Sequence, residues 1–207
     1  MQVDCTFPVF GDSCPMEHYY LLQGGLSRLV PAFHGPAGEF RFAAITGDLG
    51  ERGLLRITGK SRLRVRVPAE RIVSVLPLAG QSVLVGKHTI RLGNPTVQAL
   101  TPAPLLAAKI VTFKNAEEPA RFLAHAGERL RELGIQGEPA IPLTEKGRHA
   151  GEPRREIIRI KGHCIIGYAL QVSGLSADES IRLQESGLGG RTRMGCGFFL
   201  PYRPRES

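Results

Sequence analysis

Histidines and glycine-flanked arginines are the residues of this chain that could act on a phosphate group. The chain has six histidines among 207 residues, and imidazole is the side chain that titrates near neutral pH. His34 follows a predicted helix, between a proline and a glycine that interrupt regular structure and favour an exposed position. Residue type alone does not select one histidine as an acid–base group.

A glycine-rich run near the C-terminus is the strongest local indication of an anion site. Residues 187–197 read GLGGRTRMGCG and lead into a predicted strand. Glycines let a backbone approach phosphate oxygens, and arginines add charge-assisted hydrogen bonds. The run is not a nucleotide-binding P-loop, because no Gly-Lys-Ser/Thr follows it. The expected phosphate-binding residues are Gly187, Gly189, Gly190, Arg191, Arg193, Gly195 and Gly197. A surface loop that binds nothing is the alternative.

Two predicted strands carry alternating basic side chains. Residues 62–67 read RLRVRV, so the arginines share one face and the apolar side chains the other. Arg155, Arg159 and Lys161 repeat the pattern, and His163 follows in a predicted turn at Gly162-His163. Both patterns fit an RNA-binding surface, and a solvated sheet face fits them equally well.

The overall composition agrees with an anionic partner. Lys and Arg number 27 against 19 Asp and Glu, which gives a net charge of +8 and a pI near 9.7. Such a chain displaces counterions from phosphates, although a basic solvated surface has the same composition. Four cysteines without Cys-x-x-Cys spacing predict reduced thiols in a cytoplasmic protein, with no metal and no cofactor. Neither a signal peptide nor a membrane-spanning segment is predicted.

Two halves with a similar order of elements must position these residues. Prolines at 102 and 104 indicate a linker, so we expect an N-terminal domain at 1–103 and a C-terminal domain at 104–207. The fold class that we predict is α+β, with two tandem ferredoxin-like (RRM-like) domains.

The expected elements follow from hydrophobic periodicity and from turn residues. In the second half they are strands at 109–114, 156–161, 165–172 and 197–202, a helix at about 117–133, and a helix capped by Ser176 or Asp178. In the first half they are strands at 3–10, 41–46 and 54–67, helices at 17–30 and 69–78, and a hairpin at 82–92 with 97–100.

Several segments resemble a known group of proteins. Residues 187–201 resemble, in pattern and position, the C-terminal glycine-rich motif of the RAMP superfamily of RNA-binding proteins. Residues 17–28 (EHYYLLQGGLSR), followed by Phe33-His34, resemble the start of the CRISPR repeat-processing endoribonucleases. Residues 76–80 (LPLAG) and 158–162 (IRIKG) resemble the variety found in MYXAN-type CRISPR systems. The resemblance covers nearly the whole chain and implies tandem ferredoxin-like domains. The glycine motif also occurs in relatives that do not cut RNA.

The resemblance also implies a chemistry. A histidine just after the first helix, here His34, acts as the general base without a metal ion. The ribose 2′-OH attacks the adjoining phosphate, which leaves a 2′,3′-cyclic phosphate and a 5′-OH. Some relatives place a tyrosine late in the first helix, where this chain has Ser27 beside Arg28, and a lysine after the histidine, where Arg41 is the nearest cation. The catalytic set implied here is therefore His34, Arg28 and Ser27, with Arg28 stabilising the transition state.

The implied function is a metal-independent endoribonuclease that cleaves precursor CRISPR RNA at its repeat hairpin. The alternative is a non-catalytic RNA-binding RAMP subunit of a CRISPR effector complex, with other effector subunits as partners and no chemical role for His34. A general RNA-recognition protein fits less well, because the chain lacks an aromatic RNP signature and any Trp.

Overall fold

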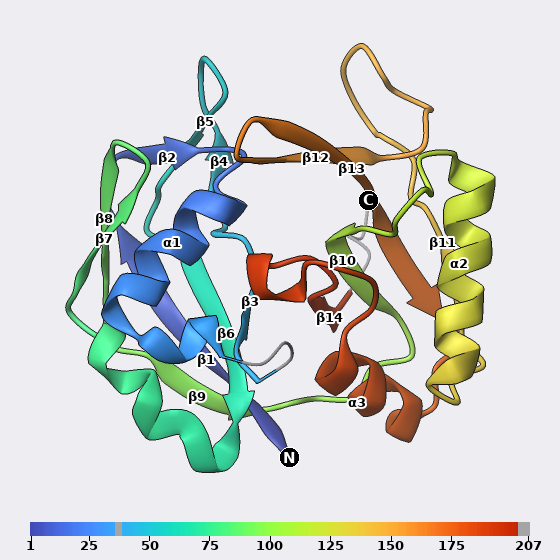
Figure 1. The fold of residues 1–207 in the computed structure, drawn as a ribbon, viewed down its shortest axis with the longest axis horizontal. Helices are drawn as coiled ribbons and strands as arrows, with labels where there is room; N and C mark the ends of the chain where they lie inside the picture. The colour runs from blue at the N-terminus through green and yellow to red at the C-terminus, as the bar shows by residue number, and fades with distance from the viewer. Residues whose placement is uncertain (36–38, 203–207) are drawn as a thin grey trace. The chain divides into compact units, whose positions relative to one another are not determined.

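The computed structural model describes residues 1–35 and 39–202, and the chain divides into two compact units. Unit 1 comprises Met1–Ala99 and the short segment Arg193–Gly195, and unit 2 comprises Leu100–Thr192 and the residues from Cys196 onward. In Figure 1 the chain runs from the blue strand β1 (Gln2–Phe10) to the red strand β14 (Phe199–Pro201). No helix of the described residues is long and apolar enough to cross a membrane.

Unit 1 is built on an antiparallel sheet with β1 near its centre. β6 (Arg62–Pro68) pairs along one side of β1, and β8 (His88–Leu92) and β9 (Thr96–Ala99) pair along the other. The sheet ends at β3 (Arg41–Phe42) and β7 (Ser82–Val85). A second, three-stranded sheet consists of β2 (Ser13–Pro15), β5 (Leu54–Arg56) and β4 (Asp48–Leu49).

The helix α1 (Tyr19–Leu29) packs on the sheet of unit 1 through residues spaced four apart. Leu22 and Leu26 are fully buried in the same core as Phe7 and Leu63, as an amphipathic helix requires. The 3₁₀ turn η1 (Pro31–His34) follows directly. This packing decides which side chains of α1 face outward.

The predicted helix at 69–78 is wrong in type. The segment forms two 3₁₀ turns, η2 (Ala69–Ser74) and η3 (Leu76–Leu78). Pro77 has no backbone N–H to donate, so an α-helix cannot continue through it. The predicted strands at 41–46 and 54–67 are likewise shorter than expected, because turns interrupt them.

Unit 2 has the element order that the second half of the sequence predicts. Its antiparallel sheet has the order β11-β13-β10-β14, from the strands β10 (Leu106–Val111), β11 (Glu138–Ala140), β13 (His163–Ser173) and β14. β12 (Arg155–Ile160) extends β13 as a hairpin. The helices α2 (Pro119–Glu132) and α3 (Ala177–Ser186) both contribute to the core of the sheet. The predicted βαββαβ order and the ferredoxin-like fold class are confirmed.

Three details of unit 2 differ from the predictions. The strand β10 begins three residues before the predicted strand at 109–114, and no strand was predicted at the position of β11. The hairpin turn lies at Lys161-Gly162 rather than Gly162-His163, since these two residues have φ of 49° and 85° and Ile160 pairs with His163. Positive φ at both central residues is what a tight two-residue hairpin requires.

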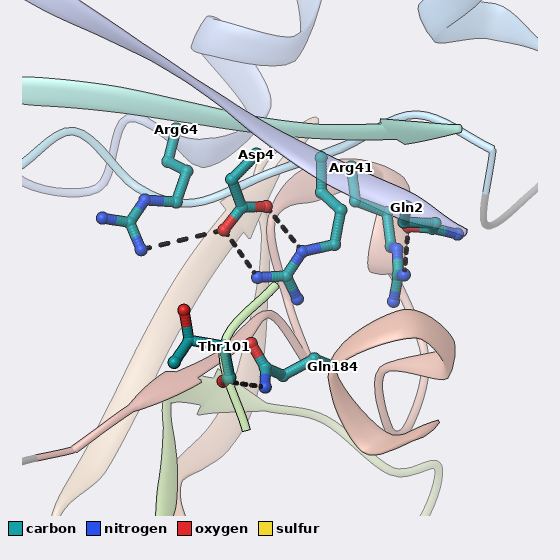
Figure 2. Close-up of polar contacts among 7 residues, drawn as sticks. Gln2, Asp4, Arg41, Arg64, Thr101 and Gln184 are labelled. Carbon is teal, nitrogen blue, oxygen red and sulfur yellow. Dashed lines mark hydrogen bonds and ion pairs between the residues drawn. The ribbon is translucent and has the colours of Figure 1, made fainter. Parts of the chain in front are cut away.

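The proline-rich segment after unit 1 is fixed to α3. The side-chain amide of Gln184 donates to the carbonyl of Thr101 at 2.9 Å, as Figure 2 shows. The N–H of Ala103 donates to the hydroxyl of Ser180, also at 2.9 Å. The α3 helix itself begins with a capping box between Ser176 and Glu179, which confirms Ser176 as the cap.

Candidate active site

A pocket of about 270 Å³ lies on unit 1 beside the outward face of α1. Besides α1, it is lined by η1, by β7 and by the turn between β7 and β8. Its lining residues are Tyr20, Leu21, Gln23, Gly24, Gly25, Arg28, His34, Leu84 and Gly86. The pocket therefore brings together a histidine, an arginine and a phenol.

The imidazole of His34 is exposed in this pocket because its neighbour anchors the turn. Phe33 is 2% exposed and packs against the rings of Phe40 and Phe42 at centroid distances of 5.7 and 6.4 Å. Consecutive residues of the 3₁₀ turn point in different directions, so the burial of Phe33 leaves the side chain of His34 outside the core. The ring is thus accessible to a ligand.

Two contacts fix the helix that carries the remaining polar groups. The carbonyl of Pro15 accepts a hydrogen bond from Nδ1 of His18 at 2.8 Å, and Nε2 accepts one from the N–H of Ile45 at 2.8 Å. These roles require a neutral ring with its proton on Nδ1. At the other contact, a Cβ on Gly25 would lie 2.5 Å from the carbonyl oxygen of Leu84, so only glycine lets α1 approach β7 this closely.

The predicted catalytic residues of α1 lie on different faces of the helix. Arg28 is exposed and lines the pocket with His34. Ser27 is 5% exposed and lies outside the pocket lining. Arg41, the cation nearest to His34 in the following sequence, is 1% exposed and donates to the Gln2 side chain at 3.0 Å.

Tyr20 is a pocket residue that the sequence reasoning missed. Tyr20, Gly24 and Arg28 are spaced by four residues and all line the pocket, as residues on one face of a helix do. The helical spacing from Arg28 could have identified Tyr20 once Leu22 and Leu26 were assigned to the buried face.

One arginine of the glycine-rich run lies beside His34 within unit 1. The Arg193 guanidinium donates to the carbonyl oxygens of His34 and Gly35, at 3.5 and 3.3 Å. The adjacent Gly195 has φ of 82°, and a Cβ there would lie 3.0 Å from the carbonyl oxygen of Phe42. The glycine is therefore required for the close approach that brings Arg193 to η1.

The glycines of this run that belong to unit 2 also satisfy demands of the fold. Gly187, Gly189 and Gly197 have positive φ, and a Cβ on Gly189 or Gly197 would lie within 2.7 Å of a backbone oxygen. The N–H of Gly190 donates to the carbonyl of Thr112 at 2.8 Å, and Arg191 is exposed. Glycine density alone is thus no indication of a ligand here, and the two arginines carry the expectation of phosphate binding.

The two basic strands differ in exposure. On β6, the fully buried Arg66 forms a bidentate pair with Asp4, at 2.7 and 2.9 Å, and Arg64 approaches the same carboxylate at 3.8 Å. Figure 2 shows Arg64 and Asp4 directed toward each other. On β12, Arg155 and Arg159 are exposed. Lys161 and His163 at the hairpin end are exposed as well.

Three of the other histidines have local partners. His88 lies 3.4 Å from the hydroxyl of Ser13, and His125 and His149 pair with Glu128 and Glu152. Across residues 1–35 and 39–202, no group of three or more His, Cys, Asp or Glu side chains is arranged to hold a metal ion.

Both units are ferredoxin-like, and unit 1 holds a histidine, an arginine and a tyrosine in one open pocket. A family model described as Cas6 Crispr matches residues 3–204. The chain is 40% identical to a CRISPR-associated endonuclease Cas6 of Myxococcus xanthus strain DK1622, over 96% of this chain and 81% of that protein. The chain belongs to the Cas6 family.

Solved structures with low sequence identity share the fold. One is described as the CRISPR associated protein Cas6, with a TM-score of 0.63, 13% identity, and coverage of 98% of this chain and 99% of the other. Another is described as a RAMP protein binding different RNA substrates, with a TM-score of 0.61, 12% identity, and coverage of 98% and 100%. These similarities agree with the tandem ferredoxin-like architecture.

Proposed function

We propose that this chain is a metal-independent endoribonuclease that cleaves precursor CRISPR RNA within its repeats. The observation that carries the proposal is the pocket that His34, Arg28 and Tyr20 line together, with His34 and Arg28 exposed and Tyr20 half-buried. Membership of the Cas6 family and the name of the Myxococcus xanthus relative, an endonuclease, support the same activity.

The three side chains supply the groups that cleavage by a neighbouring hydroxyl needs. The imidazole of His34 takes the proton of the ribose 2′-OH while the 2′ oxygen bonds to phosphorus. The bond from phosphorus to the 5′ oxygen then breaks, and the Tyr20 hydroxyl gives a proton to that leaving oxygen. The guanidinium of Arg28 stabilises the negative charge that develops on the phosphate oxygens. The products are a 2′,3′-cyclic phosphate and a 5′-OH. Ser27, being buried, has no part in these steps.

Basic side chains outside the pocket bind the repeat hairpin in this proposal. Arg191 and Arg193 contact phosphates from the glycine-rich run, and Arg159, Lys161 and His163 contact them from the β12–β13 hairpin. Their exposure supports these roles, since phosphate contacts by Lys and Arg supply most of the affinity for RNA that does not depend on sequence. The proposed setting is the cytoplasm, which agrees with four cysteines that form no disulfide.

The decisive experiment incubates the purified protein with labelled repeat RNA in EDTA. The wild type should give a single cut, and His34→Ala should lose about 100- to 10,000-fold in rate while it still binds the RNA. His125→Ala is the matched control, because His125 lies on α2 and pairs with Glu128. Undiminished cleavage by His34→Ala would refute the assignment. A wild-type protein that binds the repeat and never cuts it would favour the non-catalytic effector subunit.

A further inference from the structure

The pocket beside His34 has an apolar side that the chemistry above does not use. Leu21 of α1 is 36% exposed and Leu84 of β7 is 46% exposed, and both line the pocket. The two side chains flank the β7–β8 turn, where a Cβ on Gly86 would lie 3.2 Å from Cδ1 of Leu21. The two leucines therefore give the pocket an apolar side next to its polar groups.

Gly24 lies in the middle of α1 and is exposed. No neighbouring atom in the part of the chain that the structure describes requires a glycine at this position. A Cβ on Gly24 would meet no described atom within 4 Å, whereas one on Gly25 would meet the backbone of Leu84 at 2.5 Å. Glycine destabilises a helix interior relative to alanine. Since Gly24 lines the pocket, a ligand that passes close to the helix backbone would account for the missing side chain.

The proposed reaction determines which part of the RNA must enter the pocket. A general base must lie within hydrogen-bond reach of the proton that it removes, so the ribose with the attacking 2′-OH must lie at His34. The base on that ribose, on the 5′ side of the scissile phosphate, is then the nucleobase closest to the pocket. Gln23 of the lining has an amide that can both donate to and accept from the edge of a base.

We propose that this pocket is a specificity subsite for the nucleotide on the 5′ side of the cut. The face of its base packs against Leu21 and Leu84, and Gln23 forms hydrogen bonds with its edge. Its sugar–phosphate backbone passes over Gly24, where a methyl group would collide with it. The inference rests on the proposed nuclease function, and it adds which nucleotide is recognised and by which residues. Stacked and hydrogen-bonded single nucleotides are the usual basis of sequence-specific RNA recognition.

The first test compares two glycine-to-alanine variants. Gly127 is the matched control, because it lies inside α2 and a Cβ there would also meet nothing within 4 Å. Both Gly24→Ala and Gly127→Ala should raise the urea midpoint of unfolding, since alanine favours the helix. Only Gly24→Ala should weaken binding of a repeat RNA that carries 2′-deoxyribose at the cut and cannot be cleaved. The expected loss is about tenfold, the low end for one extra carbon in a closely fitting pocket.

Two results would overturn the subsite. One is equal RNA affinity of the Gly24→Ala and Gly127→Ala variants and the wild type. The other is a lower urea midpoint for Gly24→Ala, which would mean that the protein itself excludes a side chain there. Because the RNA in this test cannot be cleaved, the result does not depend on catalysis. Failure of the proposed function appears instead as a wild type that does not cut, or as a His34→Ala variant that does.

The second test concerns the identity of the base. Cleavage rates are measured for four repeat RNAs that differ only in the base on the 5′ side of the cut. The wild type should prefer one base by about tenfold or more, as expected of a pair of hydrogen bonds to a base edge. Gln23→Ala should cleave all four at similar rates. Equal rates for the wild type, or an unchanged preference in Gln23→Ala, would contradict the role of Gln23.

Discussion

β6 and β12 both carry basic side chains on one face, with Ile157 interrupting the series on β12, and the environments of these side chains differ. On β6, Arg66 lies opposite Asp4 of β1 and is fully buried in a bidentate pair with it. On β12, Arg155 and Arg159 lie opposite Tyr168 and Cys164 of β13, and both arginines are exposed. The difference lies in the neighbouring strand, which in one unit supplies a carboxylate and in the other does not.

This contrast shows why an arginine pattern alone does not identify a nucleic-acid surface. A carboxylate opposite an arginine neutralises it and can hold it in the interior. An exposed arginine can instead contact a phosphate. The residue that decides, Asp4, precedes Arg66 by 62 positions. We therefore infer a structural role for β6 and, of these two strands, keep only β12 in the proposed RNA-binding surface.

The largest expected effect concerns the buried pair on β6. Arg66→Ala should lower the free energy of unfolding by about 3–5 kcal/mol, because it leaves the Asp4 carboxylate buried without its bidentate partner. Arg155→Ala on β12 should change it by less than about 0.5 kcal/mol. Urea unfolding at neutral pH measures both values. The double variant Asp4→Ala/Arg66→Ala should lose less than the sum of the single losses. Equal losses at positions 66 and 155 would remove the distinction between the strands.

A cysteine lies beside each of the two strands, Cys5 beside β6 and Cys164 beside β12, so their reactivity provides a second comparison. Cys5 of β1 is fully buried opposite Val65 of β6, and Cys164 is exposed opposite Arg159. Burial, with a smaller contribution from Asp4, raises the pKa of the Cys5 thiol and so lowers its thiolate fraction at pH 8. Alkylation followed by mass spectrometry should show Cys164 reacting at least about a hundredfold faster than Cys5, which needs local opening to react.

Repeat RNA extends this comparison to binding. It should slow the alkylation of Cys164, because the hairpin is covered in the proposed complex. Cys196 serves as an internal control, since burial raises its pKa to about 12 and it should stay unmodified with or without RNA. Unchanged labelling of Cys164 at saturating RNA would argue against the hairpin as an RNA contact.

Local signals explain which parts of the fold were predictable. The α2 helix, the β12–β13 hairpin and the Ser176 cap follow from nearby residues: an apolar spacing, a glycine between two strand-forming segments, and a serine before the helix. The turn itself lies one residue earlier than predicted. The segment 69–78 has the composition of a helix. It forms 3₁₀ turns instead, because of Pro77 and of the packing of unit 1. The Asp4–Arg66 pair is long-range, so no window of sequence contains both of its members.

The candidate site was predictable in part. The proline and glycine around His34 indicated an exposed turn, and the structure places His34 in one. Ser27 and Arg28 are adjacent in sequence, but successive residues of a helix point about 100° apart, and the structure buries Ser27 while Arg28 lines the pocket. The burial of Leu22 and Leu26 fixes the rotation of α1 about its own axis. With that rotation, Tyr20 and Arg28 face the pocket.

The next effect in size concerns RNA affinity. Arg159→Ala/Lys161→Ala should bind repeat RNA more weakly and with a weaker dependence on salt. RNA affinity falls between about 50 and 200 mM salt. With two fewer phosphate contacts, the factor by which it falls should be about ten times smaller than in the wild type. Arg64→Ala on β6 should leave this salt dependence unchanged, since Arg64 lies next to Asp4. Fluorescence anisotropy at several salt concentrations measures both. A change of the same size in Arg64→Ala would place the β6 arginines on the RNA as well.

The smallest expected effect concerns Arg62, the arginine at the start of β6. Its guanidinium donates to the carbonyl oxygens of Gly59 and Ser61, at 2.9 and 2.8 Å, and so closes the turn that leads into the strand. Arg62→Ala should lower the free energy of unfolding by about 0.5–1.5 kcal/mol, the usual net value of such hydrogen bonds. The salt dependence of RNA binding should not change. The contrary outcome is that Arg62→Ala leaves the free energy of unfolding unchanged and reduces the salt dependence of RNA affinity by the amount expected for about one phosphate contact. In that case the start of β6 would contact RNA, as proposed for β12. The boundary between the structural and RNA-binding arginines would then run through β6 itself.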